Sequence, residues 1–261
     1  MFSVVIPLYN KEKSIGNTIQ SVLNQTFQDF EIVVVNDGST DNSLQVVENI
    51  NDSRIRIINK PNGGVSSARN RGIKEAKYDW IAFLDGDDAW DQEYLSEINN
   101  LITNYPEARI FSTNYARINN RNEILNIRTS SVNKGYITDF FSANNYQSIV
   151  CSSAIVFKKS CITDVIHFNE NLSFGEDLDF WIKLLKNNIL AYSPKILSFY
   201  RVDSENRSSV HIHKPKNNLA YYLDFSKLNK NSSEFIYKKK ILVASYIYYI
   251  FKFRKLLTCR F

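Results

Sequence analysis

Hydrophobic and polar positions follow two alternating patterns along the first hundred residues. Continuous apolar runs, typical of strands buried on both faces, are centred on residues 4–6, 31–35, 55–58 and 80–84. Each run precedes apolar residues spaced as on one face of a helix, within residues 15–23, 46–50, 65–76 and 94–102. Strand and helix in turn predict an α/β fold with a mainly parallel central sheet and flanking helices on both faces.

The pattern weakens after the first hundred residues. Short β-like runs lie near residues 110–115 and 153–157, and a helix fits residues 177–186. Since the chain of 261 residues has no internal repeat or low-complexity linker, it suits one globular core with a terminal extension. We expect the core over residues 1–210 and a helical extension over residues 211–261.

The two segments differ sharply in charge. Residues 1–210 carry 21 Lys and Arg against 25 Asp and Glu, whereas residues 211–261 carry 11 against 2. Such an asymmetry indicates two functional regions. Because the core is acidic and nucleic-acid binding needs basic residues around the site, we expect no nucleic-acid partner.

The extension contains a very apolar stretch, residues 241–251, between two groups of basic side chains. A membrane span needs about 20 apolar residues, so this stretch is too short to cross. Its tyrosines and flanking lysines favour a helix that lies in the bilayer interface. The alternative is a helix packed on the core with a lysine-rich outer face.

Cysteines and the N-terminus indicate the compartment. The three cysteines, Cys151, Cys161 and Cys259, show neither a disulfide nor a zinc pattern, which fits a reducing environment. Residues 1–4 enter a strand directly, without a charged n-region or a long apolar segment, so no signal peptide is expected. We expect a cytoplasmic protein, peripheral on the inner face of the cell membrane.

A polar cluster follows each of the four predicted strands. These clusters occupy residues 7–10, 36–41, 62–64 and 85–88. In an open parallel sheet, ligands bind beyond the carboxyl ends of the strands. The four clusters are therefore expected to form a single site at one edge of the sheet.

The most specific cluster is Asp85-Gly86-Asp87-Asp88. Three carboxylates in four residues repel one another unless a cation neutralises them, and ligands of this kind suit Mg²⁺ or Mn²⁺. Mg²⁺ usually binds through one or two carboxylates together with substrate phosphates. The alternative is an acidic turn that caps the helix starting near Asp91.

Other strand-end residues suit a nucleotide. Asp37 is a candidate acceptor for hydrogen bonds from a base, because residues 39–41 can cap the next helix instead. Tyr9 either packs in the core or stacks on the base. Arg69 and Arg71 either lie on a solvated helix face or bind a diphosphate, whose oxygens pair well with arginine.

Two carboxylates, Glu176 and Asp177, open a helix after Gly175. Acidic residues are favoured in a first helical turn, which is sufficient to explain them and Asp179. A carboxylate that follows a glycine turn is also a candidate general base, a role typically worth about 10²–10⁴ in rate.

Together, these clusters resemble the inverting family 2 glycosyltransferases of the bacterial surface-polysaccharide type, which have the Rossmann-like GT-A fold. The resemblance covers about residues 2–205. It rests on five ordered stretches, at residues 4–10, 31–41, 64–72, 84–88 and 175–181. It implies a UDP-sugar donor, Mn²⁺ or Mg²⁺ as cofactor, a nucleotide-binding half over about 1–105 and an acceptor half over about 106–210.

The resemblance also implies roles for individual residues. Donor contacts are implied for Pro7, Tyr9, Asn10, Asp37, Arg69, Asp85 and Gly86. Asp87 is implied as the ligand of the metal on the diphosphate, with Asp85 on the ribose or the metal. The general base is implied at Glu176 or Asp177.

One departure from the family pattern concerns a further metal ligand. Many relatives carry a histidine after the Tyr-Arg of a late strand, whereas Tyr200-Arg201-Val202 is followed here by Asp203. Asp203, His211 and His213 are the alternatives for this ligand, while His167 is expected to be peripheral.

The function that we expect is inverting transfer of a hexose or N-acetylhexosamine from a UDP-sugar. The acceptor is expected to be a hydroxyl of a lipid-linked glycan in O-antigen, capsule or lipopolysaccharide biosynthesis. One alternative is a nucleotidyltransferase that makes sugar nucleotides, but residues 7–10 are not the glycine-rich basic loop that it needs. Another alternative is a non-catalytic nucleotide-sugar binding protein.

Overall fold

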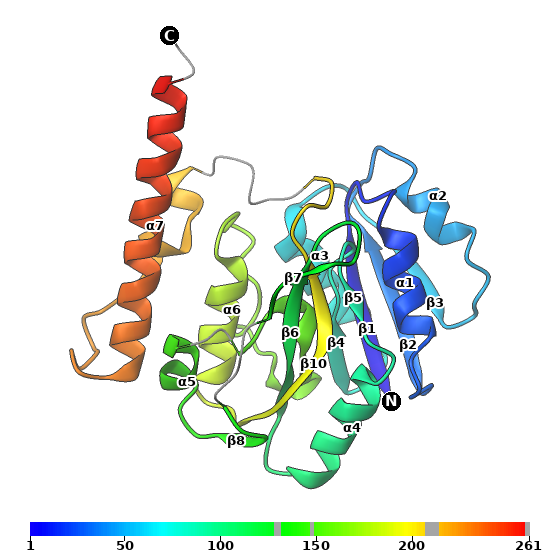
Figure 1. The fold of residues 1–261 in the computed structure, drawn as a ribbon, viewed down its shortest axis with the longest axis horizontal. Coiled ribbons are helices and arrows are strands. Elements are labelled where there is room, and N and C mark those ends of the chain that lie inside the picture. Colours follow the sequence, from blue (N-terminus) through cyan, green and yellow to red (C-terminus); the bar gives the residue numbers. More distant parts are fainter. Residues whose placement is uncertain (128–131, 147–148, 207–213, 259–261) are drawn as a thin grey trace.

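The protein folds around one β-sheet, shown in Figure 1. The computed structural model describes residues 1–127, 132–146, 149–206 and 214–258. Within them the sheet has ten strands, in the order β3-β2-β1-β4-β9-β6-β10-β5, with β7 on β6 and β8 on β10. The strands are β1 (Phe2–Leu8), β2 (Phe30–Asn36), β3 (Ile55–Asn59), β4 (Trp80–Phe83), β5 (Ala89–Trp90), β6 (Ile110–Ile118), β7 (Ile124–Ile127), β8 (Gly135–Ile137), β9 (Ile155–Lys158) and β10 (Leu190–Arg201).

Six strands point the same way. β3, β2, β1 and β4 are parallel neighbours. β9 is antiparallel to both β4 and β6, so β6 runs in the direction of β4, and β10 is parallel to β6. The predicted mainly parallel sheet is confirmed, and the carboxyl ends of β1, β2, β4 and β10 meet at one edge.

Helices cover both faces of this sheet, as predicted. The helices are α1 (Ile15–Leu23), α2 (Ser43–Glu48), α3 (Gly64–Glu75), α4 (Tyr94–Asn104), α5 (Phe140–Tyr146), α6 (Glu176–Leu185) and α7 (Ser233–Thr258). The side chains of β1 alternate between the two faces of the sheet and therefore pack in two separate cores. Val4 and Ile6 pack with α1, α2 and α4, whereas Val5 packs with α3 and α6.

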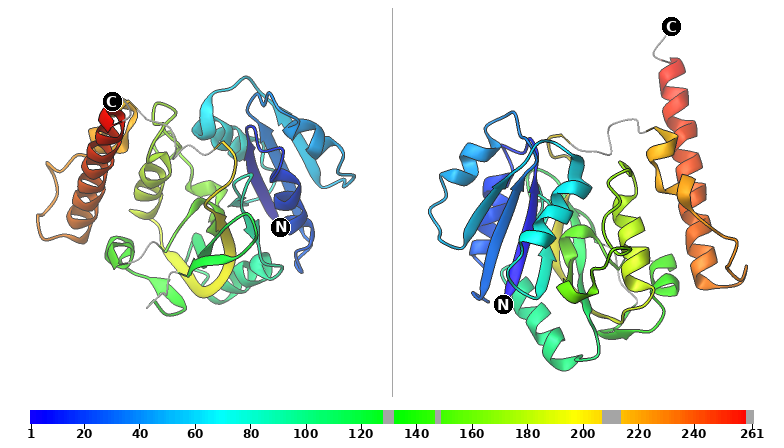
Figure 2. Two further views of the ribbon diagram at one scale, coloured as in Figure 1. Left: turned by 45° about the horizontal axis from the view of Figure 1, so that its top comes forward. Right: turned by 180° about the vertical axis from the view of Figure 1, so that it is seen from behind.

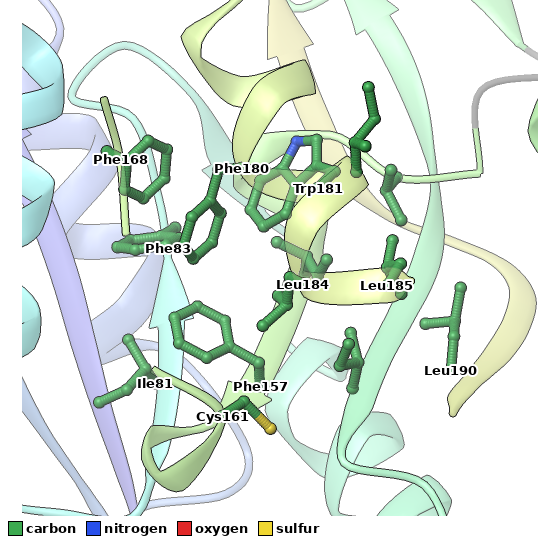
Figure 3. Close-up of a cluster of buried hydrophobic side chains, with 14 of the residues drawn as sticks. Ile81, Phe83, Phe157, Cys161, Phe168, Phe180, Trp181, Leu184, Leu185 and Leu190 are labelled. Atoms are coloured by element: carbon green, nitrogen blue, oxygen red, sulfur yellow. The ribbon is translucent and has the colours of Figure 1, made fainter. Parts of the chain in front are cut away.

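The core beneath α6 is dominated by aromatic rings, as Figure 3 shows. Phe168 stacks on Phe180 with ring centroids 4.0 Å apart, and Phe83 meets Phe168 edge to face at 5.5 Å. Such rings contribute large buried areas and specific geometry. They fix the start of α6 against the end of β4, which carries the acidic turn.

The C-terminal extension packs on this same core. Leu219 in the 3₁₀ turn η5 (Leu219–Tyr222) and Tyr237 in α7 are buried within it. The packing therefore continues across residue 210, while the predicted division of function there stays a prediction. Figures 1 and 2 show the C-terminal end of α7 rising past the edge where β1 ends. Among the described residues, no helix is long and apolar enough to cross a membrane.

Candidate active site

A cavity of about 580 Å³ lies at the carboxyl edge of the parallel strands. The four polar clusters that follow β1, β2, β3 and β4 all contribute to its wall. Nine residues predicted for the site line it: Pro7, Tyr9, Asp37, Arg69, Asp85, Gly86, Asp87, Glu176 and Asp177. The structure thus brings segments separated by up to 170 positions into one cavity, while Asn10 and Asp203 are not part of its lining.

Asp37 organises the loop that follows β3. Its carboxylate is buried and accepts hydrogen bonds from the backbone N–H groups of Gly63 (3.0 Å) and Gly64 (2.8 Å). Lys60 Nζ donates to the same oxygen as Gly63. Asp37 is therefore partly engaged within the protein, and its role as an acceptor for a base stays a prediction. Asp37 lines the cavity, and part of its hydrogen-bond acceptor capacity is used to hold the glycine loop in position.

Asn10 joins the ends of the first two strands. It adopts a left-handed backbone conformation (φ 52°), which asparagine tolerates better than most residues. Its Oδ1 accepts a hydrogen bond from Thr40 N at 2.8 Å, and its own N–H donates to Ser39 Oγ at 3.2 Å. Its side chain thus supports the loop beyond β2, and its predicted donor contact stays a prediction.

Tyr9 is open to solvent rather than part of the core. Its side chain is 38% exposed and lies in the cavity wall. Its backbone carbonyl accepts a hydrogen bond from Asn206 Nδ2 at 3.2 Å. Of the two alternatives for Tyr9, the core position is therefore excluded, and the ring is available to a ligand.

The three carboxylates of the acidic turn after β4 differ in burial and in their contacts. Asp88 is buried, and it accepts hydrogen bonds from Arg201 N (2.9 Å) and Ser153 Oγ (2.6 Å), which join β4 to β10 and to the segment before β9. Burial, followed by the charges of Asp87 and Asp85, raises the pKa of Asp88 well above its usual range. Asp88 lines the cavity together with Asp85 and Asp87, but the side chains of the latter two are more exposed, at 25% and 14%.

The carboxylates of Asp85 and Asp87 each have one oxygen engaged and one open. Oδ1 of Asp85 accepts a hydrogen bond from Arg69 at 2.7 Å. Oδ2 of Asp87 forms an ion pair with Lys11 at 2.7 Å and accepts a hydrogen bond from Ser204. The other oxygen of each makes no hydrogen bond to another described residue. Two carboxylate oxygens of this kind in one cavity wall fit a hard divalent cation that also binds substrate phosphates.

Asp203 does not join these carboxylates. Its Oδ2 accepts a hydrogen bond from Asn120 N at 3.0 Å, and its carbonyl accepts one from Asn120 Nδ2. Because Val202 pairs with Ile118, the side chain at position 203 falls on the connection between β6 and β7. The structure therefore places Asp203 outside the lining of the cavity, and its role as a metal ligand stays a prediction. His211 and His213 lie outside the described residues, within which no three His, Cys, Asp or Glu side chains form a ready metal site.

Arg69 connects the acidic turn to the carboxylates of α6. Its side chain is 4% exposed, and Nη1 lies 3.6 Å from Oε1 of Glu176. The guanidinium carbon lies 5.2 Å from the centroid of the Phe168 ring. Nε and Nη1 make no hydrogen bond among the described residues. Buried donors are usually satisfied, so these two nitrogens are available to donate to water or to a ligand in the cavity. Arg71, by contrast, pairs with Glu75 on the outer face of α3.

Glu176 and Asp177 form the first turn of α6. Burial is the main cause that raises the pKa of both carboxyls, and the charge of Asp177 helps to raise the pKa of Glu176 to about 7. Oδ1 of Asp177 accepts a hydrogen bond from Leu178 N at 2.8 Å. A carboxylate whose pKa lies near neutrality suits proton abstraction. Asp179 pairs with Lys183 at 2.6 Å and is structural, as expected.

Several residues of the site are not apparent from sequence reasoning. Lys11, Ser153 and Asn206 all line the cavity. Lys11 directly follows the first cluster, and this position is a signal that points to it. Ser153 and Asn206 lie in weakly patterned segments and reach the site only through the fold, so the sequence carries no comparable signal for them.

Comparison with known proteins decides the family. The model of glycosyl transferase family 2 matches residues 3–164, which is more than half of the chain. The chain belongs to glycosyl transferase family 2. The matched segment contains the cavity-lining residues from Pro7 to Asp88 but ends before Glu176.

Two relatives illustrate the range of this family. An uncharacterized glycosyltransferase of Rickettsia bellii is 35% identical over 215 residues, which cover 78% of this chain and 29% of the relative. Chondroitin synthase of Pasteurella multocida is 32% identical over 190 residues, which cover 70% of this chain and 19% of the relative. The chain thus spans less than a third of the length of either protein.

A solved structure of the family has the same fold. The S. aureus TarS fragment 1–349 in complex with UDP-GlcNAc superposes with a TM-score of 0.74 and 25% sequence identity. The alignment covers 92% of this chain and 70% of that chain. The predicted GT-A fold is thereby confirmed.

Proposed function

We propose that the protein is an inverting glycosyltransferase that moves a sugar from a UDP-sugar to an acceptor hydroxyl. The observation that carries this proposal is the arrangement around Arg69. It lies 2.7 Å from Asp85 on the donor side and 3.6 Å from Glu176 on the other side of the same cavity. A donor site and a candidate base therefore share one cavity, as a transfer reaction requires.

The donor side of the cavity suits a nucleoside diphosphate. The exposed ring of Tyr9 offers a stacking surface, worth about 1–3 kcal/mol for a base. Asp37 and the glycine loop that it holds line the same cavity as this ring. The TarS complex with UDP-GlcNAc supports UDP as the nucleotide.

The open oxygens of Asp85 and Asp87 are the groups that would hold Mn²⁺ or Mg²⁺. Such a cation would stabilise the negative charge that develops on the departing UDP. Lys11 already contributes a positive charge at this position through its ion pair with Asp87. Arg69 contributes another, with two donors that are unsatisfied among the described residues.

The base removes the proton of the acceptor. Asp177 or Glu176 accepts this proton as the hydroxyl oxygen attacks the anomeric carbon. A bond forms between that oxygen and the carbon, while the bond from the carbon to the phosphate oxygen breaks and UDP takes the electron pair. A single displacement from the opposite face inverts the anomeric configuration.

The extension supports an acceptor at a membrane surface. The described outer face of α7 carries exposed apolar and basic side chains: Ile236, Lys239, Lys240, Val243, Tyr246 and Ile247. This combination suits a helix in the interface of an anionic bilayer. We therefore propose a lipid-linked glycan of surface-polysaccharide synthesis as acceptor, reached at the inner face of the cell membrane.

A donor screen tests the proposed function. The purified protein is incubated with UDP-glucose, UDP-galactose and their N-acetyl forms in Mn²⁺, with and without a polyprenyl-diphosphate-linked sugar. We expect one donor to release UDP slowly alone and faster with acceptor, and EDTA to suppress both reactions. No UDP release from any donor under any of these conditions would contradict the proposal and leave a binding protein as the alternative.

A further inference from the structure

A short segment of the C-terminal extension is paired with the loop that leads into α6. Asn218 forms a parallel β-bridge with Phe174. Ser173 N donates to the carbonyl of Asn217 at 2.9 Å, and Leu219 N donates to the carbonyl of Phe174 at 3.1 Å. These backbone hydrogen bonds hold residues 217–219 directly beside the residues that precede Glu176.

Leu219 also fits against Gly175, the residue at which α6 begins. Gly175 has φ 79°, a left-handed conformation that glycine adopts without steric cost. A Cβ at this position would lie 2.9 Å from Cβ of Leu219, so the absence of a side chain permits this close approach. The position of the first turn of α6 is thus set in part by Leu219.

α7 holds this segment from behind. Asn218 is 2% exposed, and its Oδ1 accepts hydrogen bonds from Ala220 N (2.8 Å) and from Ser245 Oγ of α7 (3.4 Å). Tyr237 of α7 is buried nearby, and its hydroxyl accepts a hydrogen bond from Asn144 at 2.8 Å. The segment is therefore fixed between α7 and the loop before α6.

The side chain of Tyr237 interacts electrostatically with Asp177, one of the two proposed bases. Burial, and then the negative charge of Asp177, raise the pKa of the Tyr237 phenol. The phenol therefore stays neutral and adds no second negative charge near Asp177. The contacts of residues 217–219 reach the α6 side of the cavity, and none of those described above involves the donor loops after β1, β2 or β4.

We propose that Asn218 and Leu219 are positioning residues, which place Glu176 and Asp177 for the transfer step without contributing to nucleotide binding. This inference rests on the proposed function. A displacement of about 1 Å from the productive geometry is enough to cost about 100-fold in rate. The extension is accordingly part of the active-site scaffold rather than an appendage to it.

The experiment compares three variants of the full chain. Asn218→Ala removes the accepting oxygen, Asn218→Asp retains an oxygen at the same place, and Tyr221→Ala alters a side chain on the same segment that is 71% exposed. For each variant, kcat of sugar transfer and the dissociation constant of UDP are measured. We expect Asn218→Ala to lower kcat about 10-fold or more with UDP affinity within about 2-fold of wild type. Asn218→Asp should recover most of the rate, and Tyr221→Ala should match wild type.

The outcomes separate this inference from the proposed function. An unchanged kcat in Asn218→Ala, or an equal loss of kcat and UDP affinity, would overturn the positioning role while the wild-type rate still supports a transferase. A wild-type protein that binds UDP and transfers no sugar would overturn both. Ser245→Ala, which removes only the hydroxyl that donates to Asn218, is the milder second variant and should lower kcat by a smaller factor with UDP affinity retained.

Discussion

The donor side and the acceptor side of the cavity are built in different ways. On the proposed donor side, Tyr9 and Asp37 directly follow β1 and β2, and Asp85 lies two residues after β4, so the parallel strands position all three. On the acceptor side, Glu176 and Asp177 begin a helix whose start is held by residues more than 40 positions later in the chain. The proposed nucleotide site is therefore encoded locally, whereas the placement of the proposed base depends on long-range packing.

The strongest test of this difference is to remove the base without disturbing the nucleotide. Asp177→Asn should lower kcat by about 10²–10⁴, because the amide cannot accept the acceptor proton. UDP affinity, measured by calorimetry, should stay near the wild-type value. Asp179→Asn is the matched control on the same helix and should keep its activity, since Asp179 pairs with Lys183 outside the cavity. Near-normal turnover in Asp177→Asn would move the base to Glu176.

The converse change acts on the donor side. Asp87→Ala should lower Mn²⁺-dependent turnover by about 10²–10³, the usual cost of losing one preorganised electrostatic group. It should also weaken UDP binding in Mn²⁺ but not in EDTA. Asp91→Ala, just after β5 and outside the cavity lining, is the control. Equal UDP affinity of wild type and Asp87→Ala in Mn²⁺ would remove the metal role of this residue.

The raised pKa of Glu176 makes the acceptor side sensitive to pH. Because the pKa is raised from 4.5 to about 7 by folding, the protonated carboxyl stabilises the folded state fully below about pH 4.5. This contribution is lost as the pH rises through about 7, and it amounts to at most about 3 kcal/mol. Glu176→Gln should therefore become more stable relative to wild type between pH 5 and pH 8, as measured by urea unfolding. Glu93→Gln, an exposed control, should show no such trend, and parallel curves for Glu176→Gln would contradict the raised pKa.

The smallest expected effect concerns the outer face of α7. Each lysine near an anionic bilayer contributes about 1 kcal/mol, so Lys239→Glu and Lys240→Glu should each lower binding to phosphatidylglycerol vesicles by roughly 5-fold or more. Flotation of the variants with vesicles measures this loss. Lys74→Glu, on α3, is the control. Equal flotation of all variants would exclude α7 as the membrane-binding surface.

The same contrast explains what the sequence predicts and what it does not. The strands β1 to β4 and the helices between them follow from apolar periodicity, because each is a regular element joined by a short polar turn. β5 and β10 are not evident, since β5 has two residues and β10 contains irregular register near Ser193 and Ile196. The family resemblance rests on motifs whose residues lie close together in the chain.

Individual residues of the site show the same difference between local sequence and long-range packing. Asp85 and Asp87 are predicted from one short cluster, and the fold places both in the cavity. Asp203 is one of three alternatives for a further metal ligand, and the pairing of Val202 with Ile118 places it beside Asn120, outside the cavity lining. The contact between Leu219 and Gly175 depends on the packing of α7, which periodicity does not specify. Long-range packing therefore determines the position of Asp203 and the contact between Leu219 and Gly175.

A crystal structure of the protein soaked with UDP and Mn²⁺ is the most direct test of the proposed nucleotide and metal site. We expect the uracil ring against Tyr9, and the cation between the diphosphate and the open oxygens of Asp85 and Asp87. UDP bound elsewhere, with the two carboxylates still paired with Arg69, Lys11 and Ser204 and no cation, would contradict this site.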